Sequence, residues 1–315
     1  MEVKTEVTHH ENITEEIVSG LIQNPKRLPT KLLYDEKGSQ LFDRICELKE
    51  YYPTRTELKI LEDNINEIVD SIGEESLLLE LGSGSSLKTR LLLDNLPKLS
   101  SYVPVDISSD HLLKSAEILK ADYPGLSIYP LVADYTKPFT LPEIYESYET
   151  VDAFYPGSSI GNFTPVKAKE FLQRIAVTCG KGSGLLIGVD LKKDVDILNC
   201  AYNDDKGVTA LFNLNILNHI NNLIGADFDL NKFSHFAFYN IPESRIEMHV
   251  VSNEDQEVHI EGEEIFIRKD EHIQTEYSYK YSLEDFEKLV KGIYKVEKVW
   301  TDKNDLFSVQ FLKAL

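Results

Sequence analysis

The apolar positions of the chain change their period along the sequence. Up to residue 62 they recur at helical spacing, as Leu41, Ile45 and Leu48 do, which predicts mostly helix over residues 13–62. From residue 77 onward, short apolar runs alternate with amphipathic stretches, as strands followed by helices do. The expected strands are LLLEL (77–81), SYVPVDIS (101–108), LSIYPLVADY (126–135), the start of YETVDAFYPGSSIGN (148–162) and GLLIGVDL (184–191).

Strands that alternate with helices at this spacing predict a doubly wound parallel sheet. In such a sheet ligands bind beyond the carboxyl ends of the strands, where the strand order reverses. The alternation stops after Asp194, where an Asn-rich helical stretch (196–230) begins. Residues 245–282 then predict antiparallel strands, with hairpin turns at 253–255 and 261–263.

The end of the chain predicts a return to the first sheet. Ser282, with Asp285 three residues later, predicts a capped helix, and a terminal hairpin of Tyr294–Thr301 with Leu306–Leu312 follows. We therefore expect two domains: an α/β domain made of residues 61–194 and 281–315, and an α+β domain made of residues 1–60 and 195–280.

The amino-acid composition excludes some classes of partner and location for this protein. The 315 residues carry a formal net charge of −20, so we expect neither nucleic acid nor an anionic membrane as a partner. The three cysteines are odd in number and form no CxxC pair, which argues for reduced thiols in an intracellular protein without a metal site. Because no apolar run is long enough to span a bilayer and the N-terminus lacks a signal-peptide core, we expect a cytoplasmic protein.

A glycine turn follows the first predicted strand, at Gly82 and Gly84. A dinucleotide site would need a third glycine where Leu87 stands, and the nearby carboxylate of Glu80 would disfavour a pyrophosphate. S-adenosylmethionine has no phosphate and carries a sulfonium and an ammonium group, so a carboxylate beside the turn suits this ligand better. The alternative to a ligand-binding role is an ordinary structural turn.

Two further acidic residues end the next strands. Asp106 follows Gly84 by 22 residues, close to the spacing at which a carboxylate binds ribose hydroxyls. Asp134 and Tyr135 end the third predicted strand, where they could hold an adenine amino group and cover the ring. An Asp at a strand end is often only a helix cap. Three such signals at successive strand ends favour a nucleoside cofactor, S-adenosylmethionine.

The remaining pattern resembles a known family. The segments that carry the resemblance run from about Leu33 to Phe311 and are LLYDEKGSQLFDRICELKEYYPTRTE, ELGSGSSLKT, YVPVDIS, FYPGSSIGNF, LLIGVDLKKD, AYNDDKGVTALFNLN, SRIEMHVVS and TEYSYKYS. Together they resemble the histidine-specific N-alpha-methyltransferases of ergothioneine biosynthesis. The resemblance implies a Rossmann-like class I methyltransferase domain with a second, α+β substrate-binding domain. It also implies three methyl transfers from S-adenosylmethionine to L-histidine, which give the trimethylated betaine hercynine.

The resemblance also assigns site residues. It implies a cofactor site of Gly82, Gly84, Lys88, Asp106, Asp134, Tyr135 and Gly157. It implies that Asn162 and Tyr202 hold the substrate carboxylate, that Glu276 and Ser278 hold the imidazole with Tyr52 reaching it, and that Met248 lies in the wall. Tyr34 would lie near the α-amino group and is our candidate proton acceptor for catalysis. A carboxylate beside a hydroxyl matches the one N–H donor and one acceptor of neutral imidazole.

Each of these residues also has a structural interpretation. Asn162 could cap the next helix, Glu276 could pair with Lys280, and Lys88 could be a solvated surface charge. Tyr52 and Tyr202 could be ordinary half-buried tyrosines, and Met248 could serve packing alone.

Two positions depart from the family pattern, Gln274 and Tyr277, and both flank the pair expected to contact imidazole. The sequence therefore also allows another aromatic amino acid or amine, such as histamine or tryptophan. A non-catalytic S-adenosylmethionine-binding protein is a more distant alternative, because it would not need an amino acid site. We expect a monomer whose partners are L-histidine and its methylated forms.

Overall fold

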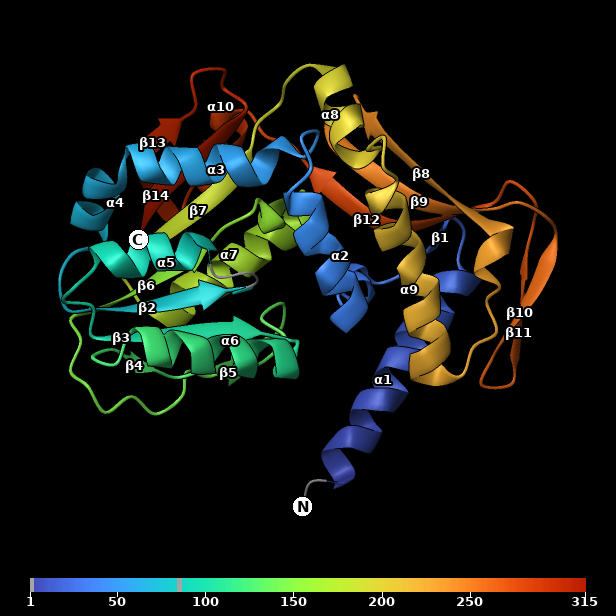
Figure 1. The fold of residues 1–315 in the computed structure, drawn as a ribbon, viewed down its shortest axis with the longest axis horizontal. Helices are drawn as coiled ribbons and strands as arrows, with labels where there is room; N and C mark the ends of the chain where they lie inside the picture. Colours follow the sequence, from blue (N-terminus) through green and yellow to red (C-terminus); the bar gives the residue numbers. More distant parts are fainter. Residues whose placement is uncertain (1–2, 84–86) are drawn as a thin grey trace. The chain divides into compact units, whose positions relative to one another are not determined.

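The computed structural model describes residues 3–83 and 87–315, and Gly84, predicted above as a cofactor residue, lies outside these ranges. The chain divides into two compact units (Figure 1). Unit 1 comprises Met1–Tyr51 and Asp194–Ser278, and unit 2 comprises Tyr52–Lys193 and Tyr279–Leu315. Residues 52–60, which the sequence analysis assigned to the α+β domain, belong to unit 2.

Unit 2 is built on one eight-stranded sheet with the order β13-β14-β7-β6-β2-β3-β4, in which β5 also pairs with β3. The strands from β7 to β4 are parallel, and β14 runs antiparallel to both of its neighbours. Strand order reverses between β2 and β6, so the predicted doubly wound sheet is confirmed. The strands are β2 (Ser76–Leu81), β3 (Ser101–Asp106), β4 (Ser127–Ile128), β5 (Leu131–Val132), β6 (Thr150–Tyr155), β7 (Gly184–Asp190), β13 (Tyr294–Thr301) and β14 (Phe307–Ala314).

One predicted strand of this sheet differs from the structure. The stretch 126–135 forms two short strands, β4 and β5, instead of one. Pro130 lies between them, and proline cannot donate a hydrogen bond to a sheet ladder.

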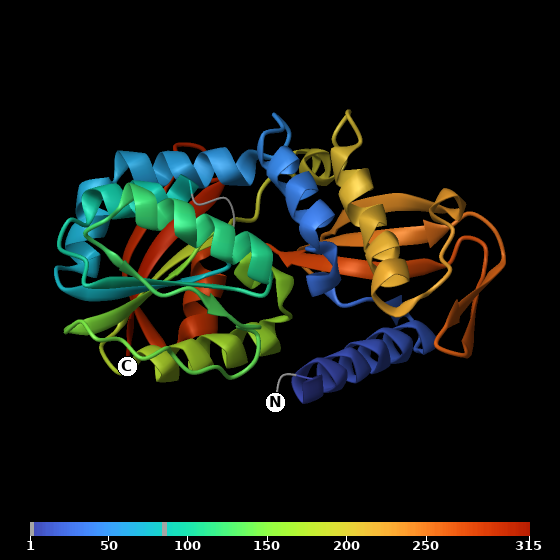
Figure 2. The ribbon, with the colours of Figure 1, turned by 60° about the horizontal axis from the view of Figure 1, so that its bottom comes forward.

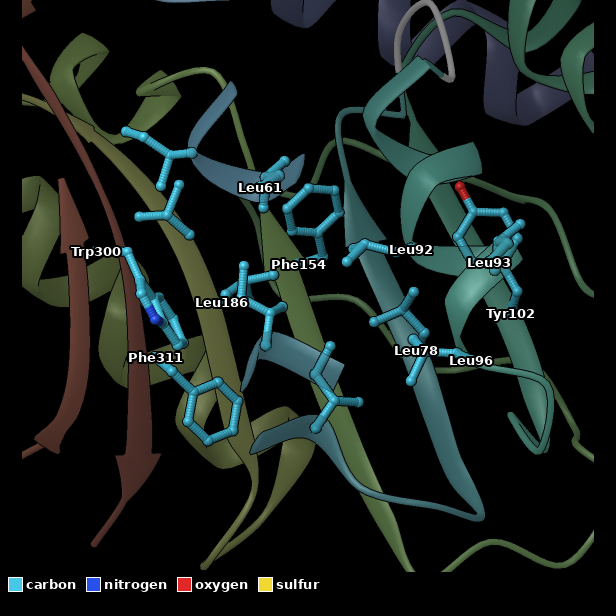
Figure 3. Packing of buried hydrophobic residues seen from close by; sticks show 14 of the residues in the cluster. Leu61, Leu78, Leu92, Leu93, Leu96, Tyr102, Phe154, Leu186, Trp300 and Phe311 are labelled. Carbon is cyan, nitrogen blue, oxygen red and sulfur yellow. The ribbon is translucent and has the colours of Figure 1, made fainter. Parts of the chain in front are cut away.

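Helices cover both faces of the sheet of unit 2. One face buries a core that combines apolar side chains of the strands with those of α3 to α6, among them Leu61, Leu92, Phe154 and Leu186 (Figure 3). Helices α7 and α10 cover the other face (Figure 2). The helices are α3 (Tyr52–Asp63), α4 (Ile65–Ile72), α5 (Leu87–Asn95), α6 (Ser109–Asp122), α7 (Pro165–Cys179) and α10 (Leu283–Val290), with a short 3₁₀ helix η2 (Ser159–Asn162). The predicted capping box of Ser282 and Asp285 is confirmed at the start of α10.

Unit 1 joins two distant parts of the chain in a four-stranded sheet with the order β1-β12-β9-β8. The N-terminal strand β1 pairs in parallel with β12, with Lys26 opposite Ile273. Helix α9 packs on strands β8 and β9 of this sheet (Figure 2). The elements are α1 (Val3–Ile22), β1 (Lys26–Arg27), η1 (Thr30–Leu33), α2 (Glu36–Cys46), α8 (Val195–Tyr202), α9 (Val208–Ile224), η3 (Leu230–Lys232), β8 (Phe233–Asn240), β9 (Arg245–Ser252), β10 (Gln256–Ile260), β11 (Glu263–Ile267) and β12 (His272–Tyr279).

Of the two hairpin turns predicted in unit 1, one is confirmed and the other is wrong. The turn at 261–263 is confirmed, because β10 and β11 form an antiparallel hairpin in which Glu261 and Gly262 both have positive φ. The prediction at 253–255 is wrong, because β10 pairs with β11 and not with β9. The hairpin that the sequence analysis missed joins β8 to β9 through residues 241–244.

The Asn-rich helical stretch of unit 1 consists of two helices, α8 and α9. Between them, Asp204 accepts hydrogen bonds from the backbone N–H groups of Val208 (2.9 Å) and Thr209 (2.8 Å), and Gly207 has a φ of 68°. The carboxylate therefore satisfies donors at the start of α9 that a helix leaves without an internal partner. Within the described part of the chain, no helix combines the length and the apolar character that crossing a membrane would need.

Candidate functional site

The predicted site residues fall in both units, and each group is described within its own unit. In unit 2 the turn after β2 brings Gly82 against Tyr135. Gly82 has a φ of 77°, and a Cβ at this position would lie 3.4 Å from the Tyr135 hydroxyl oxygen. The Tyr135 ring meets Tyr155 and Phe171 edge-on, with centroid distances of 5.9 and 6.2 Å. Burial raises the pKa of Tyr135, so this ring presents a neutral hydroxyl beside a backbone that requires glycine.

Asp106 and Asp134 lie at the same edge of the sheet, because β5 continues the pairing of β3. Asp106 Oδ1 accepts the Ser108 N–H at 2.9 Å, and burial raises the pKa of this carboxyl group. Asp134 Oδ1 accepts the Thr136 N–H at 3.0 Å. Both aspartates therefore accept hydrogen bonds within local turns. They also follow the ends of adjacent strands, where a carboxylate can accept hydrogen bonds from the hydroxyl and amino groups of a nucleoside. The residues present therefore fit such a cofactor.

Glu80 has an internal role that differs from the one suggested by the sequence. Its carboxylate accepts hydrogen bonds from the Thr89 hydroxyl at 2.8 and 2.9 Å and from the Tyr102 hydroxyl. Burial raises its pKa to about 7, against the opposing effect of these donors. Glu80 therefore ties β2 to α5 and β3 within the core and is not a marker of a cationic ligand.

A residue that the sequence analysis missed, Glu57 of α3, lies among the predicted cofactor residues. Its two carboxylate oxygens accept the Gly157 N–H at 3.0 and 2.9 Å, and one of them pairs with Lys88 Nζ. The Glu57 side chain is 1% exposed and that of Lys88 is 17% exposed, so Lys88 is not a solvated surface charge. In the sequence, Glu57 is one acidic residue among many on a helical stretch, and no local pattern distinguishes it.

Asn162 ends the turn that follows Gly157. Ser158 adopts a left-handed φ of 58°, and its carbonyl accepts the Gly161 N–H at 2.9 Å. The alternative role of Asn162 as a helix cap is wrong, because Thr164 caps α7 by accepting the Lys167 N–H. The turn after β6 therefore places Gly157 and Asn162 at the carboxyl end of the parallel strands.

Tyr52 belongs to a buried ionic cluster of unit 2. Its hydroxyl donates to the two oxygens of Asp190 at 2.7 and 2.8 Å, and Lys193 Nζ lies 4.5 Å from the centre of its ring. Lys193 and Lys280 both pair with the Asp190 carboxylate. Lys280, for which Glu276 was the alternative partner, thus has its Nζ 2.7 Å from Asp190 Oδ2.

This cluster, which we call the Asp190 cluster (Tyr52, Asp190, Lys193 and Lys280), has opposing electrostatic effects. Burial acts to raise the pKa of Asp190, but Lys280 and Lys193 outweigh it and lower that pKa. Burial lowers the pKa of Lys193 to about 8, although Asp190 acts in the opposite direction. Two cations on one buried carboxylate make its ionised form essential to this part of unit 2.

In unit 1 the structure brings together Tyr202 of α8 and Ser278 of β12. The Tyr202 hydroxyl donates to Ser278 Oγ at 3.0 Å. Tyr202, Ser278 and the neighbouring Glu276 are 7%, 5% and 6% exposed, so all three are buried. The prediction divided these side chains between the carboxylate and the imidazole of a substrate, whereas Tyr202 is bonded to one of the two residues assigned to imidazole.

Aromatic rings surround this polar group. Tyr34 contacts Phe42 and Phe212 edge-on at 5.6 and 5.4 Å, Phe42 lies 6.1 Å from Tyr51, and Tyr51 lies 6.3 Å from Tyr202. These five rings form an aromatic chain from α2 and α9 to α8.

Tyr51 is a candidate site residue that the sequence analysis missed. Burial raises the pKa of Tyr51 well above its usual value, and Tyr202, Cys46, Tyr34 and Glu276 add to this effect. Among the predicted residues, Glu276, Tyr202 and Tyr34 thus lie within electrostatic reach of Tyr51. The sequence analysis chose Tyr52, but α3 begins at that residue and directs it into unit 2. The tyrosine pair was visible in the sequence, whereas the point at which the helix begins was not.

Met248 and the two positions that depart from the family pattern, Gln274 and Tyr277, lie on the sheet of unit 1. Met248 is 1% exposed on β9. The guanidinium of Arg245 stacks on Tyr277 at 3.8 Å from the ring centre, and Gln274 is buried with its carbonyl bonded to the Leu28 N–H. Tyr277, one of the two departures, therefore makes a cation–π contact with Arg245.

Comparison with known proteins adds independent information. The sequence matches the profile of the family described as "Histidine-specific methyltransferase, SAM-dependent" over residues 13–314. It is 38% identical to the Histidine N-alpha-methyltransferase of Mycolicibacterium smegmatis over 93% of this chain and 92% of that protein. It is 34% identical to Ergothioneine biosynthesis protein 1 of Neurospora crassa over 89% of this chain and 32% of that protein. In fold alone, it resembles a putative methyltransferase from Thermobifida fusca, with a TM-score of 0.50, 11% identity and coverage of 90% and 92%.

Proposed function

The chain belongs to the family of S-adenosylmethionine-dependent, histidine-specific methyltransferases, and from this premise we propose that it methylates the α-amino group of L-histidine in three rounds, giving hercynine. The observation that carries the proposal is the buried group of Glu276, Ser278 and Tyr202, which offers hydrogen-bond partners to both nitrogens of a neutral imidazole. The 38% identity to a Histidine N-alpha-methyltransferase over almost the whole chain supports it.

Unit 2 is the proposed methyl-donor domain. Gly82, Asp106, Asp134 and Tyr135 would hold the nucleoside, while Lys88 and the turn at Gly157 would hold the amino acid end. When bound, S-adenosylmethionine supplies a methyl group on a positively charged sulfur. Asp106 offers a carboxylate to ribose hydroxyls, and the Lys88 ammonium, 17% exposed, offers N–H donors to a carboxylate.

Unit 1 is the proposed substrate-binding domain. Glu276 accepts a hydrogen bond from one imidazole nitrogen, and Ser278 bonds the other, with the Tyr202 hydroxyl fixing the orientation of Ser278. Because these groups are buried, an amine without the ring nitrogens would leave them unpaired and bind poorly.

The amine must lose a proton before each transfer, because an ammonium group has no lone pair. Tyr34 or a bound water is the proposed acceptor of this proton, and the Tyr34 hydroxyl would relay it by passing its own proton to solvent as it accepts the proton of the amine. The rings of Tyr34, Phe42 and Phe212 lie together, and aromatic faces stabilise the cation that grows with each methyl group. Holding the amine in line with the donor would supply about 7–11 kcal/mol of the barrier through alignment.

The test is a substrate panel analysed by mass spectrometry. The purified chain is incubated with S-adenosylmethionine and, separately, with histidine, its mono- and dimethyl forms, histamine and tryptophan. We expect histidine to gain one, two and then three methyl groups, and the two methylated forms to be converted to the same product. Binding of S-adenosylhomocysteine with methylation of tryptophan or histamine in place of histidine would contradict the proposed substrate but retain the reaction type. An absence of methyl transfer to every compound, with intact cofactor binding, would favour a non-catalytic protein.

A further inference from the structure

We propose that Glu57 is a positioning residue for the methyl donor: its buried carboxylate holds Lys88 and the Gly157 backbone together so that both present donors to the amino acid end of the cofactor. This inference rests on the proposed function, because it takes Lys88 and Gly157 as cofactor-binding residues. Glu57 itself would act through these two residues.

The contacts converge on one carboxylate from three elements. Glu57 belongs to α3, Lys88 to the first turn of α5, and Gly157 to the turn after β6. Glu57 accepts the Gly157 N–H with both oxygens, at 3.0 and 2.9 Å, and Lys88 Nζ pairs with Oε2. A Cβ built on Gly157 would lie 3.9 Å from Lys88 Nζ, so the two groups held by Glu57 also adjoin each other.

The sheet provides the space that this carboxylate needs. A Cβ at Gly188, in the buried strand β7, would lie 2.0 Å from Glu57 Oε1. Glycine weakens the interior of a strand, and it is found there where another group must approach closely. Gly188 therefore makes room for Glu57 at the carboxyl edge of the sheet.

Burial makes the arrangement rigid. A carboxylate that is 1% exposed requires partners, and Lys88 is the cation that it contacts. The pair therefore confines the ammonium group, which on an exposed lysine would sample many positions. An ammonium has three N–H donors. The contact with Glu57 uses one and directs the others away from it.

The alternative is that Glu57 only fastens α3 to the sheet, and a matched control separates the two roles. Asp152 is another buried carboxylate of unit 2, 1% exposed, which accepts the Gly184 N–H and hydroxyl donors of Ser76 and Thr150. It lies on β6 near the amino ends of the strands, where Ser76 and Thr150 begin β2 and β6, whereas the predicted cofactor residues follow the carboxyl ends. Asp152→Asn therefore reports the cost of neutralising a buried structural carboxylate.

The experiment measures S-adenosylhomocysteine affinity by calorimetry and thermal stability by circular dichroism, with the KM of each substrate measured alongside. For Glu57→Gln we expect affinity for S-adenosylhomocysteine to fall about tenfold, because a charge-assisted contact that confines Lys88 is lost. The KM for S-adenosylmethionine should rise by a similar factor, with little change in the KM for histidine. Asp152→Asn should lower thermal stability without changing the affinity.

A second variant keeps the test decisive if Glu57→Gln does not fold. Gly188→Ala retains all three contacting residues but displaces the Glu57 carboxylate, and it should weaken S-adenosylhomocysteine binding in the same direction. Unchanged or tighter binding by whichever variants fold would overturn the proposal, because the role of Glu57 would then be structural. If the wild-type chain does not bind S-adenosylhomocysteine, the proposed function itself fails, which is a separate outcome.

Discussion

The two units arrange their candidate residues by different means. In unit 2, the residues lie at the ends of successive parallel strands, so the topology of the sheet alone brings Gly82, Asp106 and Asp134 to one edge. In unit 1, Tyr34, Tyr202 and Ser278 come from two chain segments that are far apart in sequence and meet only through side-chain contacts. Residues at strand ends can be located from the pattern of strands and helices, whereas the residues of unit 1 were named only through the family resemblance.

Three buried carboxylates, Glu57 and Asp190 of unit 2 and Glu276 of unit 1, also have different neighbours. Glu57 and Asp190 of unit 2 are paired with lysines. Glu276 of unit 1 lies among tyrosines, including Tyr51. We infer that Glu57 and Asp190 fix other groups, whereas the proposed role of Glu276 is to bind the substrate. The following predictions test this difference, from the largest expected effect to the smallest.

Asp190→Asn should have the largest effect on stability. It removes the charge that two buried lysines share, and an uncompensated buried charge costs about 3–5 kcal/mol. Urea unfolding of the full chain measures this change in the free energy of unfolding. Asp63→Asn, which removes an exposed ion pair with Lys59, should cost far less, because an exposed ion pair contributes little to stability. Equal effects of the two substitutions would show that the Asp190 cluster does not stabilise unit 2.

Glu276→Ala should affect activity and leave stability nearly unchanged. We expect kcat/KM for histidine to fall about 10³-fold, because a site built to bond the imidazole loses a charged hydrogen bond. Calorimetry with S-adenosylhomocysteine should give wild-type affinity. Glu247→Gln is the control, since Glu247 is another carboxylate of unit 1 but is held by Arg245 and Asn240. Wild-type kinetics for Glu276→Ala would remove Glu276 from the substrate site.

Glu80→Gln should show an effect that depends on pH. Folding raises the pKa of Glu80 from 4.5 to about 7, so the native state binds more protons than the unfolded state within this window. The stability that this group contributes is present below pH 4.5 and is lost as the pH rises to 7. The free energy of unfolding of Glu80→Gln, relative to wild type, should therefore increase by about 3 kcal/mol between pH 4.5 and 7.5.

A second substitution sharpens this pH prediction. The Thr89 hydroxyl donates to Glu80 and lowers its pKa, so Thr89→Val should move the window to higher pH. Urea titrations at several pH values measure both shifts. A difference between Glu80→Gln and wild type that stays constant across these pH values would show that folding does not change the pKa of Glu80.

Tyr202→Phe should have the smallest effect. It removes the hydrogen bond to Ser278 Oγ, which is worth about 1 kcal/mol, or roughly a fivefold loss in kcat/KM for histidine. The control is Phe238→Leu, which replaces a partly exposed aromatic residue on β8 of the same unit and should leave the kinetics unchanged. A loss of several hundredfold would indicate that Tyr202 contacts the substrate directly as well as through Ser278.

The sequence predicted unit 2 better than unit 1, and the reasons are physical. Alternating strands and helices have periods that are visible in the sequence, and strand ends then locate Asp106 and Asp134. The pattern does not reveal which donors a buried carboxylate meets, so Glu80 was interpreted as facing a ligand and Glu57 was not noticed. Hydrophobic periodicity also does not specify which strands pair with each other, so the hairpin turn predicted at 253–255 was wrong.

The tyrosine pair illustrates the same limit at the scale of a single residue. Tyr51 and Tyr52 are adjacent and chemically identical, but a helix begins between them. Tyr51 joins the aromatic rings of unit 1, whereas Tyr52 bonds Asp190 in unit 2. Only the local backbone direction distinguishes the two, and that direction depends on tertiary contacts.

The Asp190 cluster has a consequence for how this protein could be re-engineered. The chain passes from one unit to the other after Tyr51, after Lys193 and after Ser278, and Tyr52, Lys193 and Lys280 all bond the same carboxylate. At each of the three points where the chain passes between the units, a nearby residue of unit 2 therefore bonds Asp190. A foreign domain inserted at these points in place of unit 1 would leave these bonds intact, provided that Asp190 and its three partners were kept.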